Sequence, residues 1–388
     1  MNIKELTKKY SQYITDMRRE FHMYPEIGWQ EVNTSKRIQE ELDKMGIPYI
    51  PAAKTGIIAT IEGKKGGKTV ALRADMDALE VEELNEVDYK SRNKGVSHAC
   101  GHDGHMAMLL GAAKVLSEIK NELNGTVKLI FQPAEEAMNG APSIIEDGGL
   151  DGVDNIFGIH IIGMFPVGLI SVGKGPRMSS ADHFFIDVIG KGGHGGMPDQ
   201  TVDSVVAASA IVMNLQSIAS REINPVEPVV ISVGKFHAGT RYNVIAGSAR
   251  LEGTTRCFDH EIGKKLPDIM ERIITNTAKS YRAEAKLEYV KGVPPTVNET
   301  KSADRTEKMV INTYGKDVLF QMPPITGAED FSFYLEKVPG VYIFIGAMNE
   351  EKKACQAQHH ERFNIDEDAL EIGTVLHVQY SLDFLNEN

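Results

Sequence analysis

Few cysteines and no long apolar run set the first limits on this sequence. Three cysteines among 388 residues, an odd and sparse count, do not suggest a disulfide framework and favour a reducing compartment. No run of about 18 apolar residues is present that would span a membrane. The N-terminal segment MNIKELTKKYSQYI is charged and amphipathic and lacks the apolar core of a signal peptide. We therefore expect a cytoplasmic protein.

Positive charge is also scarce, because the formal net charge is −12. An acidic chain is a poor binder of nucleic acid and of anionic membrane surfaces, so we expect neither as a partner. The rest of the composition, with 42% hydrophobic and 25% charged residues, is that of a globular protein. The length suggests two or three domains with sizeable cores.

Strands and helices alternate over the first 180 residues and again near the C-terminus. This alternation predicts an α/β fold whose sheet is covered by helices on both faces. Between these parts the order changes to β-α-β-β-α-β, the split βαβ or ferredoxin-like arrangement. We therefore expect residues 1–180 and 293–388 to form one α/β domain, with an inserted ferredoxin-like domain at 181–292.

Periodicity and turn residues place the individual elements. The main helices are predicted at 4–22, 31–45, 106–120, 203–220, 260–281, 302–314 and 366–384. The strands are predicted at 56–63, 68–79, 125–132, 153–160, 183–190, 228–236, 243–256, 285–292 and 341–347.

The segment HACGHDGH at residues 98–105 packs three histidines, a cysteine and an aspartate between glycines. Further polar groups follow the predicted α/β strands, namely Asp75, Asp77, Glu135, Glu136, His160, His359 and His360. Open α/β sheets bind ligands beyond the carboxyl ends of their strands. Imidazole, thiolate and carboxylate together suit a borderline-soft divalent ion such as zinc, nickel or cobalt. One ion uses at most about four protein ligands, so the surplus predicts two adjacent ions that share a water.

The adjacent carboxylates Glu135 and Glu136 then have a natural division of roles. Neighbouring side chains on an extended backbone diverge, so the two cannot do the same work. One carboxylate would bind metal, and the other would accept a proton from the water.

Several motifs follow one another along the chain: RADMDAL, HACGHDGHMAMLLGAA, FQPAEE, GIH, GKGGH and RFNIDE. In this order they closely resemble the di-metal aminoacylase/carboxypeptidase family, in the branch of hippurate hydrolases, N-acetyl-diaminopimelate deacetylases and auxin-conjugate hydrolases. The resemblance covers nearly the whole chain. It implies a di-zinc exopeptidase-like α/β catalytic domain, an inserted lid or dimerisation domain, and a homodimer or dimer-based tetramer.

The resemblance also implies roles for individual residues. Five residues resemble the metal ligands, namely Cys100, His102, Glu136, His160 and His359. They would hold two divalent ions, Zn, Ni, Co or Mn. Glu135 resembles the general base, and Asp77 the carboxylate that lies beside the metals. His194 resembles the lid histidine that polarises the scissile carbonyl, often in the neighbouring subunit's site. Asn243 and Arg256 match positions near the substrate.

The sequence departs from the family pattern at a few places. The C-terminal ligand motif usually reads His-x-Pro-x-Phe, whereas this chain has HHERF. Counting back four residues from Phe363 selects His359, with His360 as the alternative. Asp75 also stays open, as a weak ligand, a partner of a ligand or a strand cap. Glu80 replaces the usual proline after RADMDAL, and a glycine stands where alanine is usual in GKGGHGG.

Together these observations predict a metal-dependent amidohydrolase that converts N-acyl amino acids, of the N-acetyl or N-benzoyl type, to a carboxylic acid and a free amino acid. Glu135 would accept the proton of the attacking water, and His194 with one metal would stabilise the oxyanion. A metallo-carboxypeptidase acting on short peptides is the alternative, because it forms the same kind of intermediate. A non-catalytic binding protein is a third hypothesis, against which the second carboxylate beside Glu136 argues.

Overall fold

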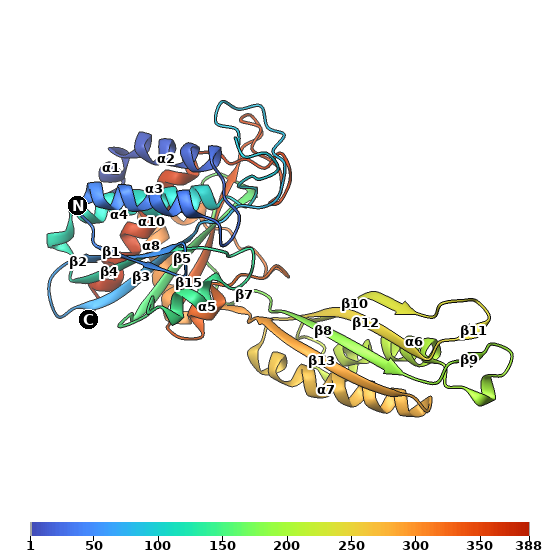
Figure 1. The fold of residues 1–388 in the computed structure, drawn as a ribbon. Coiled ribbons are helices and arrows are strands. Elements are labelled where there is room, and N and C mark those ends of the chain that lie inside the picture. Colours follow the sequence, from blue (N-terminus) through green and yellow to red (C-terminus); the bar gives the residue numbers. More distant parts are fainter. Residues whose placement is uncertain (1, 388) are drawn as a thin grey trace. The chain divides into compact units, whose positions relative to one another are not determined.

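The computed structural model describes residues 2–387, and the chain forms two compact units (Figure 1). The first unit comprises residues 1–175, 297–323 and 330–388, and the second comprises 176–296 and 324–329. These boundaries differ by a few residues from the expected insertion at 181–292. The segment 324–329 belongs with the second unit because Ile325 pairs with Met178 and exchanges backbone hydrogen bonds with Arg177 and Ser179.

A seven-stranded sheet runs through the first unit in the order β1-β2-β4-β3-β5-β15-β6. Its strands are β1 (Tyr49–Ala52), β2 (Gly56–Glu62), β3 (Lys68–Asp75), β4 (Gly125–Gln132), β5 (Asn155–Pro166), β6 (Ile170–Ser171) and β15 (Gly340–Met348). The central pairs β4–β3, β3–β5 and β5–β15 are parallel. The carboxyl ends of these four strands therefore meet at one edge of the sheet, where polar groups from distant sequence segments can converge.

Helices pack around this sheet (Figure 1). They are α1 (Ile3–Lys8), α2 (Ser11–Met23), α3 (Val32–Met45), α4 (His102–Glu118), α5 (Gly140–Glu146), α8 (Thr300–Tyr314), α9 (Ser332–Leu335) and α10 (Asp368–Leu385). The central helix is α4, whose sequence HDGHMAMLLGAAKVLSE is buried at nearly every position. It packs against β3, α2 and α10. A helix that is apolar on all sides belongs in a core, and here it fixes the histidines at its first turn against the sheet.

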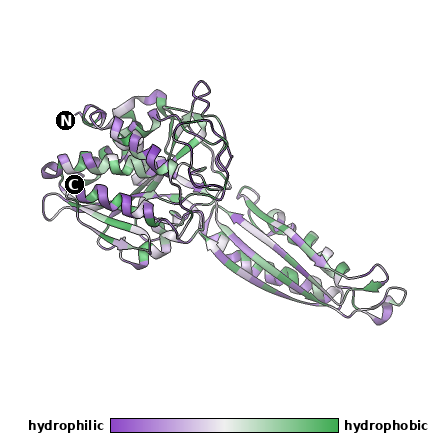
Figure 2. Cartoon of the chain, turned by 45° about the horizontal axis from the view of Figure 1, so that its top comes forward, coloured by the Kyte–Doolittle hydropathy of each residue, from purple (hydrophilic) through white to green (hydrophobic). Residues whose placement is uncertain are grey.

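The second unit has its own core and a four-stranded antiparallel sheet in the order β10-β12-β8-β13. Its elements are β8 (Ala181–Ile189), α6 (Ser204–Leu215), β10 (Val229–Ala238), β12 (Ser248–Cys257), α7 (His260–Ser280) and β13 (Glu284–Val293). This is the βαββαβ order of the ferredoxin-like arrangement. Figure 2 shows hydrophilic and hydrophobic residues alternating along this unit, as expected for a sheet with one face covered by helices.

Two short two-stranded sheets complete the fold. One pairs β9 (Gly193–His194) with β11 (Val244–Ile245), and the other pairs β7 (Gly175–Met178) with β14 (Thr296–Asn298). None of the helices among residues 2–387 has the length and apolar character needed to cross a membrane.

Candidate metal centre

The predicted ligands of the first unit converge at the carboxyl edge of its parallel strands. Glu135 and Glu136 follow β4, His160 lies on β5, and His359 lies in the segment after β15. Cys100, two residues before α4, and His102, the first residue of α4, reach the same place. These positions agree with the expectation that ligands bind beyond the carboxyl ends of the strands in an open α/β sheet.

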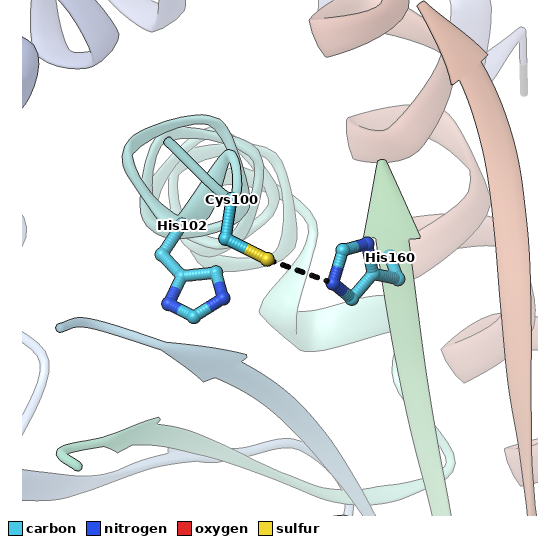
Figure 3. Close-up of side chains that lie close together, drawn as sticks. All are labelled: Cys100, His102 and His160. Atoms are coloured by element: carbon cyan, nitrogen blue, oxygen red, sulfur yellow. Dashed lines mark hydrogen bonds between the residues drawn. The ribbon is translucent and has the colours of Figure 1, made fainter. Parts of the chain in front are cut away.

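Cys100, His102 and His160 are buried members of the cluster and lie close together (Figure 3). The Cys100 Sγ atom lies 3.5 Å from Nε2 of His160. Gly101, the N-cap of α4, stands between Cys100 and His102 with φ of 95°, in the left-handed region that glycine adopts without strain. This conformation lets the chain turn sharply enough for Cys100 and His102 to face the same point.

Hydrogen bonds fix the tautomer of both histidines. Nδ1 of His102 lies 2.8 Å from the carbonyl oxygen of Asp77, and Nδ1 of His160 lies 2.6 Å from the carbonyl oxygen of Ile161. A carbonyl oxygen only accepts, so in each neutral ring the proton resides on Nδ1. Each Nε2 atom then carries the lone pair that a divalent ion requires.

The two glutamates are held by one carboxylate. Oδ1 of Asp77 accepts from the backbone N–H of Glu135, and Oδ2 accepts from that of Glu136, both at 3.0 Å. The preceding residue, Ala134, has φ of 52°, a left-handed conformation that is uncommon for alanine. This turn separates the two side chains: Oε1 of Glu136 lies 3.4 Å from Nε2 of His359, and Oε2 of Glu135 lies 4.0 Å from Nε2 of His102.

The structure distinguishes His359 from His360. The backbone N–H of His359 donates to the carbonyl of Ala99 at 2.7 Å, which brings its ring next to Cys100 and Glu136. Nδ1 of His360 instead accepts from the backbone N–H of Arg362 at 3.0 Å. Within residues 2–387, His360 joins no group with the spacing of metal ligands.

The donor atoms fit a divalent metal. Five groups among residues 2–387 have possible ligand atoms within 4.8 Å of one another. Three of them overlap and consist only of predicted site residues, namely Cys100–His102–His160, Cys100–Glu136–His359 and His102–Glu135–Glu136. Nε2 of His102 is buried and makes no hydrogen bond among the described residues, and the buried Oε1 of Glu136 faces Nε2 of His359 at 3.4 Å. Buried polar atoms normally have partners, so atoms like these, aimed into a set of imidazole, thiolate and carboxylate groups, suit coordination of borderline-soft ions.

The electrostatics of the cluster favour a cation. Hydrogen bonds to Cys100 and Glu136 raise the pKa of His359 to about 10, which reports the local excess of negative charge. Burial lowers the pKa of His160 to about 3, so its ring is neutral and able to ligate. For Glu136 burial favours the acid, but the bond to His359 and the charge of His102 outweigh it and lower the pKa.

Asp75, whose role the sequence left open, is fully buried at the end of β3. Oδ2 accepts from Nη1 of Arg73 at 2.5 Å, and Oδ1 lies 2.6 Å from Nδ1 of His105. Sequence reasoning assigned no role to His105 or Arg73. The i, i+3 spacing of His102 and His105 on one helix face was the available signal for the first, whereas the pairing of Arg73 with Asp75 depends on the tertiary fold.

The other three predicted residues belong to the second unit. His194 on β9 pairs with Val244 on β11, and the N–H of Gly195 donates to the carbonyl of Asn243 at 2.9 Å, so His194 and Asn243 lie together. Arg256 lies eight residues beyond Ser248, the first residue of β12, or about 25 Å along that strand. His194 and Asn243 therefore lie side by side at the β9–β11 pair, whereas Arg256 lies near the opposite end of β12 from Ser248.

The chain is similar to known proteins over nearly its whole length. The model of "Peptidase family M20/M25/M40" matches residues 71–383. Thermostable carboxypeptidase 1 of Saccharolobus solfataricus is 40% identical over 390 residues, covering 99% of this chain and 98% of that protein. N-acetylcysteine deacetylase of Bacillus subtilis is 38% identical over 369 residues, 95% of each chain. The structure of Bacillus subtilis YXEP superimposes with a TM-score of 0.86 at 34% identity, covering 97% of this chain and 99% of that chain. That protein is described as a dinuclear metal-binding peptidase of the M20 family.

Proposed function

The chain belongs to peptidase family M20/M25/M40, and on this premise we propose that it is a metal-dependent amidohydrolase acting on N-acyl amino acids. The observation that carries the proposal is the convergence of three overlapping ligand groups on one edge of the sheet, with a second carboxylate, Glu135, beside them. A site that only bound metal would have no use for that second carboxylate.

We assign the ligand role to five residues of the cluster, namely Cys100, His102, Glu136, His160 and His359. Of the three overlapping groups, two share Cys100 and two share His102, an arrangement that suits two neighbouring ions better than one. Divalent ions, when bound, supply Lewis-acid chemistry that polarises a carbonyl and lowers the pKa of water to about 7. Asp77 keeps both glutamates in place through their backbone N–H groups.

Glu135 is proposed as the general base. Its side chain is buried on the same side of the cluster as His102, 4.0 Å from Nε2. In this position it accepts a proton from the attacking water as the new C–O bond forms. It then gives that proton to the amide nitrogen as the C–N bond breaks, so that the products are a carboxylic acid and a free amine.

His194 is proposed to stabilise the developing oxyanion from the second unit. Its Nδ1 accepts from the backbone N–H of Gly196 at 3.0 Å, so in the neutral ring the proton resides on Nε2. That N–H is a donor suited to a carbonyl oxygen that gains negative charge. We propose that the second unit dimerises and presents His194 to the partner's site. Asn243 lies beside it and is proposed to contact the substrate, and the substrate contact of Arg256 stays a prediction.

The substrate class is proposed from the named relatives. N-acetylcysteine deacetylase of Bacillus subtilis acts, by its name, on an N-acyl amino acid. A second candidate activity, carboxypeptidase cleavage of short peptides, is favoured by the similarity to thermostable carboxypeptidase 1.

Cys100, Cys257 and Cys355 are free thiols, and we propose the reducing cytoplasm as the location.

Turnover of one metal-saturated preparation tests the substrate class. We expect kcat/KM for N-acetyl or N-benzoyl amino acids to exceed kcat/KM for unblocked dipeptides by at least about tenfold, a difference of about 1.4 kcal/mol in transition-state stabilisation. The reverse order would establish the carboxypeptidase. Absence of turnover on both classes with metal bound would support a binding protein and contradict the proposal.

A further inference from the structure

The backbone N–H and C=O groups of Ile161 both support residues of the metal cluster. The carbonyl oxygen of Ile161 accepts hydrogen bonds from Nδ1 of His160 at 2.6 Å and from Nε2 of Gln358 at 2.8 Å. Gln358 directly precedes His359 in the chain. This carbonyl thus holds the proposed ligand His160 directly, and it holds the proposed ligand His359 through the preceding residue. The two ligands come from sequence segments on either side of the second unit.

The backbone N–H of Ile161 donates to Nε2 of His105 at 2.9 Å. Because this N–H is a donor, Nε2 of His105 carries the lone pair and Nδ1 carries the proton. Nδ1 faces Oδ1 of Asp75 at 2.6 Å, and Asp75 is itself paired with Arg73. Both nitrogens of His105 are therefore engaged, and neither has a lone pair directed at a metal. His105 and Asp75 form a possible ligand group with His102 by distance alone, but their hydrogen bonds exclude that use.

Side chains pack closely around His105, so a change in the position of its ring would also move the neighbouring rings of His102 and His160. A Cβ atom at Gly104 would lie 2.6 Å from Cδ1 of Ile161, so a larger residue there would require the Ile161 side chain to move. The His105 ring stacks on His102, with centroids 5.4 Å apart, and meets His160 edge-on at 4.8 Å. The ring of His105 is thus wedged between two proposed ligands and fixed at both nitrogens.

We propose that His105 is a positioning residue that, through the backbone of Ile161, fixes the orientation of His160 and of the segment carrying His359. The proposal rests on the proposed function, because it takes His160 and His359 as ligands. Asp75 and Arg73 serve this arrangement by holding the proton of His105 on Nδ1. Partners of this kind commonly change metal affinity about 10–100-fold when they are removed.

Two amide variants separate the two hydrogen bonds of the His105 ring. In His105→Gln the longer side chain places its carbonyl oxygen near the former Nε2, where it can accept from the Ile161 N–H. In His105→Asn the shorter side chain places its amide nitrogen near the former Nδ1, where it can donate to Asp75 but leaves the Ile161 N–H without an acceptor. His105→Ala removes both bonds.

Full-length protein loaded with Co²⁺ supplies readouts other than activity. The measurements are the apparent Co²⁺ dissociation constants by chelator competition, the visible absorption spectrum, and the number of ions bound at saturation. We expect His105→Asn and His105→Ala to bind Co²⁺ about 10–100-fold more weakly with a shifted spectrum, and His105→Gln to recover most of the affinity and the spectrum. The number of ions at saturation should equal that of the unsubstituted protein in all three, because His105 is not a ligand.

His377→Asn is the matched control, because His377 is 1% exposed, like His105, and packs edge-on against Phe157 of the same strand, β5. It should lower thermal stability and leave the cobalt spectrum unchanged. Three outcomes overturn the proposal: loss of one ion in His105→Ala, equal weakening in the Gln and Asn variants, or an equal spectral shift in the control. Unsubstituted protein that binds no metal would instead refute the proposed function, so the two failures are distinguishable.

Discussion

Nε2 of His359 lies 3.4 Å from Oε1 of Glu136, although the second unit separates these residues in the sequence. Glu136 follows β4 and His359 follows β15, and the parallel order of the sheet brings the two strand ends to one edge. The cluster therefore requires segments from before and after the inserted unit. A ligand set divided in this way forms only when the whole first unit has folded.

The two adjacent glutamates should fail in different ways when each is changed to glutamine. Glu135→Gln removes a proton acceptor and keeps the shape, so both ions should stay bound while kcat falls by at least about 10²–10⁴-fold. Glu136→Gln weakens a ligand, so metal affinity should fall together with activity. Metal analysis and kcat on the same preparations check this. Metal loss in Glu135→Gln with both ions kept in Glu136→Gln would show that the roles are reversed.

His359, and not His360, should be the C-terminal ligand. His359→Ala should need far more added metal to reach its maximal activity, because a ligand that faces Cys100 and Glu136 is lost. His360→Ala is the neighbouring control, since Nδ1 of His360 accepts from the backbone N–H of Arg362 and its side chain joins no ligand group within residues 2–387. Titration of activity against metal concentration compares them. A large shift for His360→Ala alone would contradict the assignment.

The proposed action of His194 across a dimer predicts complementation. His194→Ala chains keep Glu135, and Glu135→Gln chains keep His194, so each homodimer should be nearly inactive. Random co-expression should give about half heterodimers, each with one complete site of two, and roughly a quarter of the unsubstituted activity should return. Purified heterodimers without recovered activity would show that His194 serves its own chain or has no catalytic role.

A stability prediction concerns Glu41, far from the cluster in the N-terminal helices. Its carboxylate pairs with Arg37 at 2.5 Å and Lys44 at 2.7 Å and accepts from Tyr13 at 2.9 Å. Burial raises the pKa, but the bonds to Lys44, Arg37 and Tyr13 outweigh it and lower the pKa to about 2. A depressed pKa in the folded state contributes stability above the unfolded value of about 4.3, and this contribution is lost as pH falls toward 2.

Glu41→Gln should therefore lose stability near neutral pH and show a shallower decline between about pH 4.5 and pH 2 than the unsubstituted protein. Denaturant unfolding at a series of pH values measures both curves, and kcat at neutral pH should be unchanged. Parallel curves for the two proteins would contradict the predicted role of this ion pair.

Much of the fold could be predicted from local pattern. β4 begins and ends as the apolar run GTVKLIFQ predicts, because a strand buried on both faces reads as continuous hydrophobic sequence. The α/β class with its family and its hydrolase function are confirmed by the family match and the solved relative. The ordered motifs predicted which residues would be candidate ligands, because ligand types and strand ends are both visible in the sequence, and the structure brings these residues together.

Other features depend on tertiary contacts, which the hydrophobic periodicity of the sequence does not predict. The predicted helix at 4–22 is broken into α1 and α2, since Tyr10 leaves the helical conformation and the Ser11 hydroxyl donates to the Lys8 carbonyl. The predicted strand at 243–256 is broken near Gly247, because β11 pairs with β9 whereas β12 pairs with β10 and β8. His105 was visible in the motif, but its bond to a strand backbone could not be read from the sequence.

The number of metal ions bound per chain tests the central claim most directly. Protein purified without chelator, saturated with Zn²⁺ or Co²⁺ and freed of excess metal, should contain two ions per chain by elemental analysis, and activity should rise as the ions are bound. A firm plateau at one ion with full activity would contradict the two-metal account, and full activity with no bound ion would contradict the metal-dependent mechanism itself.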